Sequence, residues 1–302
     1  AVIKHFPKGL SKAQYKRELH NYSFESIAKS PFIRSMLDLI GHDEPSTTTA
    51  TATAMYGFRM DGYGFMATAV RRVSVGLPIP RISARSTLEA LVVIDGEDGF
   101  LTDVNPNNVF LSGVDCPLPT VKLGDLGNRL SPNIRELMSA GPMYNIRFQG
   151  VIIRAPEVWI DAQPLTPKAD VWSLGVTMAH WLAGRMVFGA ADKIIEDCVE
   201  HWCIAKLMRL VGPLPKPDPS KTEIVDEIAL AEFLERETFA HPETGVEQPF
   251  IRVGTIRQEL EKVEGPIDRD CIRFIESFSC GSEEETKCKG GTATSLATRN
   301  VR

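Results

Sequence analysis

The pattern of apolar and polar positions divides the chain into a front with short β-type runs and a longer, helical back. Residues 1–6 form a β-type run, and residues 11–29 are mostly helix formers that Ser11 can cap. A second apolar run follows at 31–41. Residues 81–94 have apolar positions at helical spacing. The front therefore predicts one short strand and at least two helices.

Two further β-type runs, at 109–111 and 120–125, bracket a segment rich in turn-forming residues. Beyond them the apolar spacing becomes helical. The predicted helices cover roughly 167–186, 191–211, 224–238, 255–263 and 268–278. Proline-rich connectors separate these helices, and no internal repeat is visible. The fold class predicted from this pattern is α+β, with a small β-containing front and a larger helical back.

Three stretches carry no pattern that demands packing. Residues 43–56 are biased in composition and are interpreted as a loop. From there to Pro80 the pattern is interrupted by glycines and fixes no element, although strands fit it. Residues 279–302 are polar and rich in Gly, Ser and Thr, which is typical of a disordered tail.

Composition narrows the classes of protein. A length of 302 residues with 43% hydrophobic residues allows one large domain or two lobes, each with a core. The net charge of −5 gives no general attraction to nucleic acid or to an anionic membrane. No apolar run reaches the about 18–20 residues that span a bilayer, and the first residues lack the pattern of a secretory signal. We expect an intracellular protein, cytoplasmic or nuclear.

The six cysteines are irregularly spaced, unlike a disulfide framework, which favours a reducing compartment. Cys198, His201 and Cys203 are close enough in sequence to suggest a metal site. The alternative is that they belong to a packed helix, because the surrounding apolar residues follow helical spacing. No second ligand pair appears, so helix packing is the better interpretation.

Residue types that carry chemistry gather in two places. In "TDVNPNN" Pro106 fixes a turn, so that Asp103 and Asn108 can face a common space. Asp125, in "GDLG", follows a β-type run where Gly127 frees the backbone to turn. Carboxylate and amide oxygens suit Mg²⁺. The alternative is that these residues only cap turns. Two such segments in order, each beside a β-type run, favour a functional site.

With these residues in place, the chain resembles a eukaryotic-type protein kinase, and especially its SR-protein-kinase-like branch. Thr102-Asp103 resembles that branch's His-Thr-Asp, and Asp103 with Asn108 matches the family's Asp-x-x-x-x-Asn. Asp125-Leu126-Gly127, followed by Asn128, corresponds to Asp-Phe-Gly. "RAPEVW" (154–159) and "ADVWSLGV" (169–176) match the elements that follow. Four motifs thus lie in the family's order between residues 100 and 186.

The front resembles the family in fewer residues. "AVIK" is similar to the Val-Ala-x-Lys strand, which makes Lys4 the candidate lysine that contacts phosphate. Glu18, in the predicted helix, is placed to pair with it. A lysine and a glutamate at this spacing are common on protein surfaces, so this assignment depends on the motifs downstream.

The resemblance implies a two-lobed fold that uses ATP and Mg²⁺ to phosphorylate Ser or Thr hydroxyls of a protein. Residues 1–80 would be a partial, N-terminally truncated small lobe, residues 81–278 the helical lobe, and residues 279–302 a tail. Asp103 would accept the hydroxyl proton. Asp170 would brace the catalytic loop. The nucleotide and its metal ion would be held by four residues: Lys4, Glu18, Asn108 and Asp125, of which Asn108 and Asp125 bind the metal.

Several positions depart from the family pattern. No glycine-rich loop precedes Lys4, and Asn105 stands where the family has a lysine beside the catalytic aspartate. Leu101 and Thr102 replace the loop's His and Arg, which argues against switching through a loop phosphate. Gly150 stands where a hydroxyl residue is usual. Other departures are that the hinge, expected within 55–80, has no recognisable pattern, and that no tail arginine is available to Glu157.

These departures leave three hypotheses. The first is an active serine/threonine-type kinase acting on a protein, with Ser/Arg-rich substrates suggested by the branch. The second is a pseudokinase that serves as a binding scaffold. The third is a decayed, non-functional kinase fragment. Nothing in the sequence argues for contact with nucleic acid or a membrane.

Overall fold

The computed structural model describes residues 2–6, 11–40, 56–60, 64–66, 79–114, 116, 118–131, 147–162, 166–263 and 267–278. The loop interpreted at 43–56 lies outside these residues except for its last position. Most of the expected hinge region at 55–80 and the whole tail at 279–302 also lie outside them.

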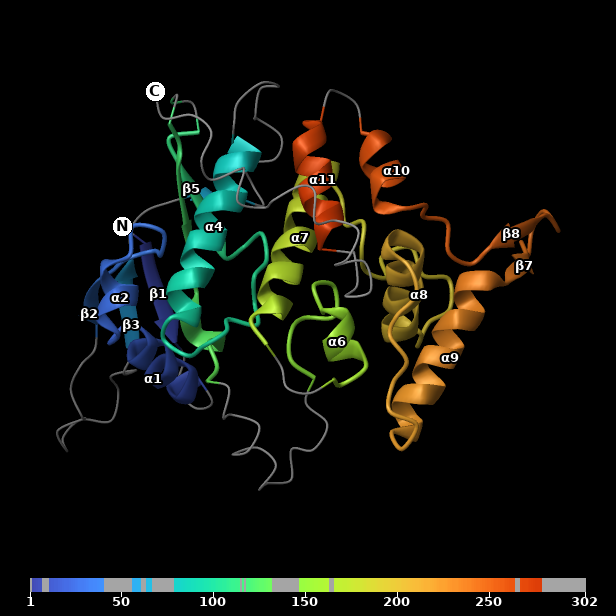
Figure 1. The fold of residues 1–302 in the computed structure, drawn as a ribbon, viewed down its shortest axis with the longest axis horizontal. Helices are drawn as coiled ribbons and strands as arrows, with labels where there is room; N and C mark the ends of the chain where they lie inside the picture. Colours follow the sequence, from blue (N-terminus) through green and yellow to red (C-terminus); the bar gives the residue numbers. More distant parts are fainter. Residues whose placement is uncertain are drawn as a thin grey trace, which may run out of the picture.

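The N-terminal part is a three-stranded antiparallel sheet with two helices beside it (Figure 1). Its elements are β1 (Val2–Phe6), α1 (Ser11–Asn21), α2 (Glu25–Lys29), β2 (Met36–Ile40) and β3 (Tyr56–Met60). The strand order is β1-β3-β2, so β1 is an edge strand. Because side chains alternate along a strand, Ile3 faces outward and is 64% exposed, whereas Lys4 and Phe6 face the other way. This alternation directs Lys4 toward α1.

The buried face of α1 is formed by Tyr15, Glu18 and Tyr22, spaced three and four residues apart as on one side of a helix. The rings of Phe6 and Tyr15 meet edge to face at 5.6 Å, and the Tyr22 hydroxyl donates to the Arg34 carbonyl at 2.9 Å. The sequence pattern suggested a different apolar stripe, because a glutamate was not expected on the buried side. The two tyrosines therefore carry Glu18 into the interior.

A second antiparallel sheet, in the order β4-β5-β6, joins the front to the helical part. It is formed by β4 (Gly64–Phe65), β5 (Val109–Ser112) and β6 (Thr120–Leu123), and the helix α4 (Ile79–Asp95) packs against β6. Beyond β6, a Cβ at Gly124 would lie 2.7 Å from the Phe110 ring. Only glycine allows this close approach, which fixes the path of the chain into the next turn.

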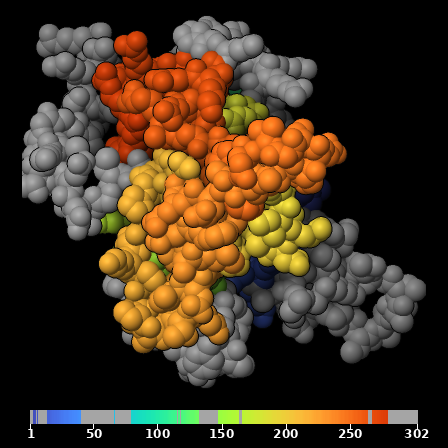
Figure 2. Space-filling model, turned by 90° about the vertical axis from the view of Figure 1, so that its right-hand side faces the viewer, coloured from blue at the N-terminus to red at the C-terminus, as the bar shows by residue number. Residues whose placement is uncertain are grey.

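The remaining residues form a mainly helical part around α7, the central helix in Figure 1. All residues from Trp172 to Trp181 are buried, as expected for a helix surrounded by protein. The elements are η1 (Leu126–Asn128), α6 (Pro156–Trp159), α7 (Lys168–Ala183), α8 (Val199–Val211), α9 (Thr222–Arg236), β7 (Thr238–Ala240), β8 (Glu247–Pro249), α10 (Ile256–Glu261) and α11 (Arg269–Ser277). Figure 2 shows α9 and the β7–β8 hairpin as a continuous ridge across one end of the molecule.

The helices of the back half follow the predicted order, with one clear difference in extent. The helix expected from 191 begins only at Val199, and residues 191–198 form turns instead. Asp192 accepts hydrogen bonds from the Trp202 indole at 3.2 Å and the Lys206 ammonium at 3.0 Å. These contacts hold the segment alongside α8 rather than in line with it. The described helices include none with the length and apolar character needed to cross a bilayer.

Burial of His180 on α7 predicts that acid destabilises the fold. Its Nε2 accepts the Phe188 N–H at 3.0 Å, and burial lowers the pKa of His180 to about 4. The unfolded chain, with a pKa of about 6.5, binds this proton first, so stability falls as pH drops from 6.5 toward 4. Urea unfolding at pH 7 and pH 4.5 should show His180→Gln losing about 2 kcal/mol less than the wild type between the two pH values. Other groups titrate equally in both proteins; equal losses would contradict the assignment.

Candidate active site

The loop from Leu101 to Asn108 is fixed from below by Asp170 at the start of α7. The backbone N–H groups of Leu101 and Thr102 donate to the two oxygens of Asp170 at 2.5 and 2.8 Å. Thr102 has a φ of 62°, a left-handed conformation that a β-branched residue seldom adopts. Strain of this kind persists only where the surroundings impose it. The bracing role that the resemblance implied for Asp170 therefore has a direct geometric basis.

Replacing Asp170 should destabilise the fold strongly. Asp170→Ala leaves two buried N–H groups without an acceptor, which costs about 2–4 kcal/mol in the free energy of unfolding. Burial raises the pKa of Asp170 to about 6, and the two N–H groups oppose that rise. Chemical denaturation at pH 7.5 measures the loss. Asp226→Ala, an exposed aspartate on α9, is the matched control, and equal stability of the two variants would contradict the bracing role.

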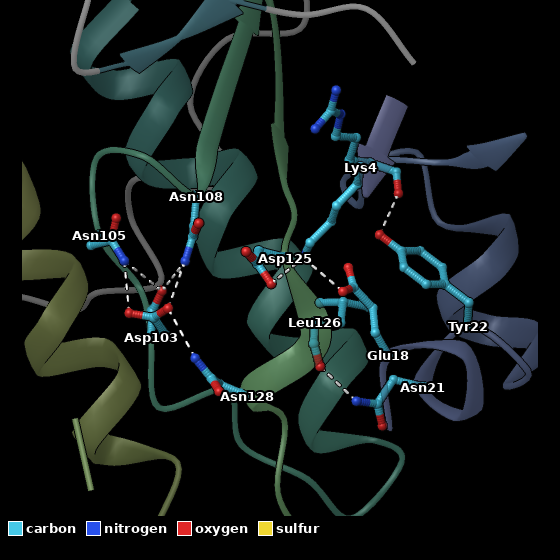
Figure 3. Close-up of polar contacts among 11 residues, drawn as sticks. Lys4, Glu18, Asn21, Tyr22, Asp103, Asn105, Asn108, Asp125, Leu126 and Asn128 are labelled. Atoms are coloured by element: carbon cyan, nitrogen blue, oxygen red, sulfur yellow. Dashed lines mark hydrogen bonds and ion pairs between the residues drawn. The ribbon is translucent and has the colours of Figure 1, made fainter. Parts of the chain in front are cut away.

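The carboxylate of Asp103 is surrounded by the side-chain amides of three asparagines (Figure 3). Asn105 donates to Oδ1 at 2.7 Å, while Asn108 and Asn128 donate to Oδ2 at 3.0 and 3.1 Å. Asn108 also donates to the Asp103 carbonyl at 2.8 Å. Asn105, at the position where the family has a lysine, thus supplies a donor without a positive charge.

The protonation of Asp103 reflects two opposing effects. Partial burial raises the pKa of Asp103 above its ordinary value, and the nearby charge of Asp125 adds to the rise. The three amide donors lower it, because they stabilise the ionised form. The outcome is a carboxylate with raised basicity whose orientation is fixed, and such a group can accept a proton from a hydroxyl.

Lys4 joins two carboxylates from distant parts of the chain. Its Nζ lies 2.6 Å from Glu18 Oε2 on α1 and 2.6 Å from Asp125 Oδ1 beyond β6. The Glu18 side chain is fully buried, and burial raises its pKa while Lys4 opposes the rise. Glu18 Oε1 is also buried and has no hydrogen-bond partner among the described residues. The ammonium group is therefore held at a fixed position that faces the metal-binding loop.

The turn after β6 presents Asp125 through the conformation of Asp125 itself. Its φ of 58° and ψ of 67° are left-handed, a conformation that aspartate tolerates better than most residues. The sequence analysis assigned the freedom to turn to Gly127, and this was wrong: Gly127 is not among the residues with positive φ. The carboxylate of Asp125 directly precedes the 3₁₀ turn η1.

Asn108 and Asp125 fit a magnesium site. In Figure 3 the Asn108 amide nitrogen faces Asp103, and its oxygen lies on the side of Asp125. One oxygen of Asp125 contacts Lys4, which leaves the other for a cation. An amide oxygen and a carboxylate oxygen, supplemented by water and phosphate, are the ligands that Mg²⁺ prefers. When bound there, the ion would neutralise charge on phosphate oxygens.

A second set of contacts ties α1 to the metal-binding loop. The Asn21 amide, at the end of α1, donates to the Leu126 carbonyl at 2.6 Å. The Arg129 guanidinium donates to Asn21 Oδ1 at 3.3 Å and lies over the Phe24 ring at 4.8 Å. α1 therefore carries Glu18 and also fixes the turn that presents Asp125.

Charged pairs to α8 and α9 hold the segment that returns toward α6. Arg147 forms a bidentate pair with Glu227 at 2.8 and 2.5 Å, and Arg154 contacts Glu200 at 3.1 Å while lying over the Trp159 ring. Burial raises the pKa of Glu157, and no arginine pairs with it within the described ranges. The expected lack of an arginine partner thus leaves Glu157 half-buried, while other pairs anchor this region.

The structure brings the predicted site residues into two adjoining groups. Lys4, Glu18 and Asp125 form one, and Asp103 with Asn108 forms the other. Sequence reasoning missed Asn21 altogether and noted Asn128 only as a mark of the branch. A side-chain amide three residues after an important acid, as in Asp125 and Asn128 or Glu18 and Asn21, was the available signal, but that spacing is too common to be informative by itself.

Comparison with known proteins supports the same interpretation. Residues 68–279, more than two thirds of the chain, match the family described as "Protein kinase domain". The meiotic mRNA stability protein kinase SSN3 of Saccharomyces cerevisiae is 28% identical over 118 residues, which are 38% of this chain and 20% of that protein. The extracellular signal-regulated kinase 1 of Candida albicans (strain WO-1) is 31% identical over 109 residues, 35% of this chain and 24% of that protein.

A putative cyclin-dependent kinase F-2 of Oryza sativa subsp. japonica is 28% identical over 123 residues, 39% of this chain and 35% of that protein. The matched part thus spans between a fifth and about a third of each relative's length. These matches and the mixed helical and sheet architecture confirm the predicted α+β kinase-like fold and the predicted enzyme family. The chain belongs to the protein kinase family.

Proposed function

We propose that this protein transfers the γ-phosphoryl group of ATP, as its Mg²⁺ complex, to a serine or threonine hydroxyl of a protein. The observation that carries the proposal is the convergence of Lys4, Glu18 and Asp125 at 2.6 Å contacts, next to an oriented Asp103. Lys4 holds the phosphates and Glu18 holds Lys4. Asn108 and Asp125 are the metal ligands. Several relatives are named as mitogen-activated or cyclin-dependent kinases, which supports this reaction.

The chemistry requires little of the protein besides positioning and neutralisation of charge. The substrate hydroxyl oxygen bonds to the γ-phosphorus, and the bond from that phosphorus to the β–γ bridging oxygen breaks. The hydroxyl proton passes to Asp103, and ADP leaves. Asn105 brings no cation to this step, which favours slow transfer because a charged donor at such a site contributes substantially to the rate.

The finer assignment to the SR-protein-kinase-like branch rests on Thr102-Asp103 and on Asn128 after Leu126-Gly127. It leads us to propose Ser/Arg-rich protein substrates. A peptide of Ser-Arg repeats should accept labelled γ-phosphate, whereas the same peptide with alanine at each serine should not. Equal labelling of both peptides would contradict serine as the acceptor.

Nucleotide binding is tested separately from transfer. Mg²⁺-ATP at a hundred times its Kd should stabilise the protein by about 2.7 kcal/mol, seen as a rise in Tm. Asp125→Ala should remove the dependence on Mg²⁺, while the Asp226→Ala control should retain it. No stabilisation of the wild type by Mg²⁺-ATP would refute the proposed site. Stabilisation without any transfer would favour the binding-scaffold alternative.

A further inference from the structure

The two oxygens of the Asp103 carboxylate have unequal partners. Oδ2 accepts two amide donors, from Asn108 and Asn128, whereas Oδ1 accepts one, from Asn105. A carboxylate offers about two lone-pair positions on each oxygen. Oδ2 is therefore saturated and Oδ1 retains one position. The Asn105 donor is also shared with the Asp103 carbonyl at 3.3 Å, so it holds Oδ1 less tightly.

We propose that Asn128 is a positioning residue for the proposed phosphoryl transfer: by completing the partners of Oδ2 with Asn108, it leaves Oδ1 as the atom that accepts the substrate proton. The inference rests on the proposed function. The proton leaves the hydroxyl for Oδ1 as the oxygen–phosphorus bond forms and ADP departs. Asn128 touches neither reactant and acts through Asp103.

The placement of Asn128 supports this role. It ends the turn η1, three residues after Asp125, and its carbonyl accepts the Thr102 hydroxyl at 3.1 Å. Its backbone is thus fixed to the catalytic loop while its side chain reaches Asp103. The side chain is exposed, so it does not bond to Asp103 merely to satisfy a buried amide. The contact links the proton acceptor to the loop that carries the metal-binding carboxylate (Figure 3).

Two substitutions separate a donor role from a space-filling one. Asn128→Ala removes the donor and should lower kcat about 10–100-fold, because a displaced catalytic group reacts far more slowly. Asn128→Asp keeps the shape but places a carboxylate against Asp103, and should lower kcat further. KM for ATP should stay within about twofold in both, because neither substitution touches the residues of the nucleotide site. Asn107→Ala, an exposed asparagine in the same loop, is the matched control and should retain wild-type kcat.

Wild-type kcat in Asn128→Asp, or equal kcat in Asn128→Ala and Asn107→Ala, would overturn the inference. A second measurement does not depend on transfer. In ¹⁵N-labelled protein, the side-chain amide resonances of Asn128 should shift on Asp103→Ala, and those of Asn21 should not. If the wild type transfers no phosphate, the proposed function fails and this spectrum decides the contact: a shift supports it, and unchanged Asn128 resonances refute it.

Discussion

Asp103→Asn is expected to lower phosphoryl transfer by about 10²–10⁴-fold, the usual contribution of a general base. The substitution keeps the shape of the side chain and removes only its charge and basicity. Asn108 Nδ2 still has the Asp103 main-chain carbonyl as an acceptor at 2.8 Å, so the loop should keep its fold. Labelled transfer to a Ser-Arg peptide at saturating ATP measures the loss.

The control for this experiment is nucleotide binding. Stabilisation by Mg²⁺-ATP should be nearly unchanged in Asp103→Asn, because Lys4, Asn108 and Asp125 remain in place. A variant that binds Mg²⁺-ATP but transfers nothing assigns Asp103 to the chemical step. If the rate of transfer stays within twofold of the wild type, the role assigned to Asp103 is wrong and another group accepts the proton.

Lys4→Met is expected to reduce both stability and activity. It removes the cation that faces Glu18, whose side chain is fully buried, and leaves that charge without its partner. Breaking a buried pair from one side costs about 3 kcal/mol, and uptake of a proton by Glu18 limits the loss. Urea unfolding at pH 7.5 measures this effect, and a nucleotide titration measures the loss of phosphate binding.

The double variant Lys4→Met/Glu18→Gln separates these effects. Replacing the buried carboxylate by a neutral amide should restore about half or more of the lost stability, because no unpaired charge remains. Activity should not return, since no cation contacts the phosphates. If the double variant is no more stable than Lys4→Met, the loss comes from packing around the lysine stem and not from the charge of Glu18.

The chemical groups of the site could be predicted because they lie in local patterns. Asp103 and Asn108 share one loop, and Asp125 follows a strand, so short segments contain most of their geometry. The pairing of Lys4 with Glu18 also appears in the structure. It could be predicted only through the resemblance, because spacing alone does not place a lysine opposite a glutamate fourteen residues away.

Other features depend on packing that a sequence pattern does not express. The buried face of α1 contains Tyr15, Glu18 and Tyr22, and a search for apolar stripes passes over a glutamate. The hairpin of β7 and β8 has three residues in each strand, all exposed or half-exposed, so it carries no alternation to detect. Asn128 acquires its contact only when η1 brings it beside the catalytic loop.

The double attachment of α1, through Lys4 on its middle and Asn21 at its end, has a mechanical consequence. The helix and the turn of Asp125 move as one rigid lever, because both contacts would have to break for one to shift alone. A protein or compound that tilts α1 from outside would therefore disarm cation binding at a distance, without entering the cleft where the ion sits.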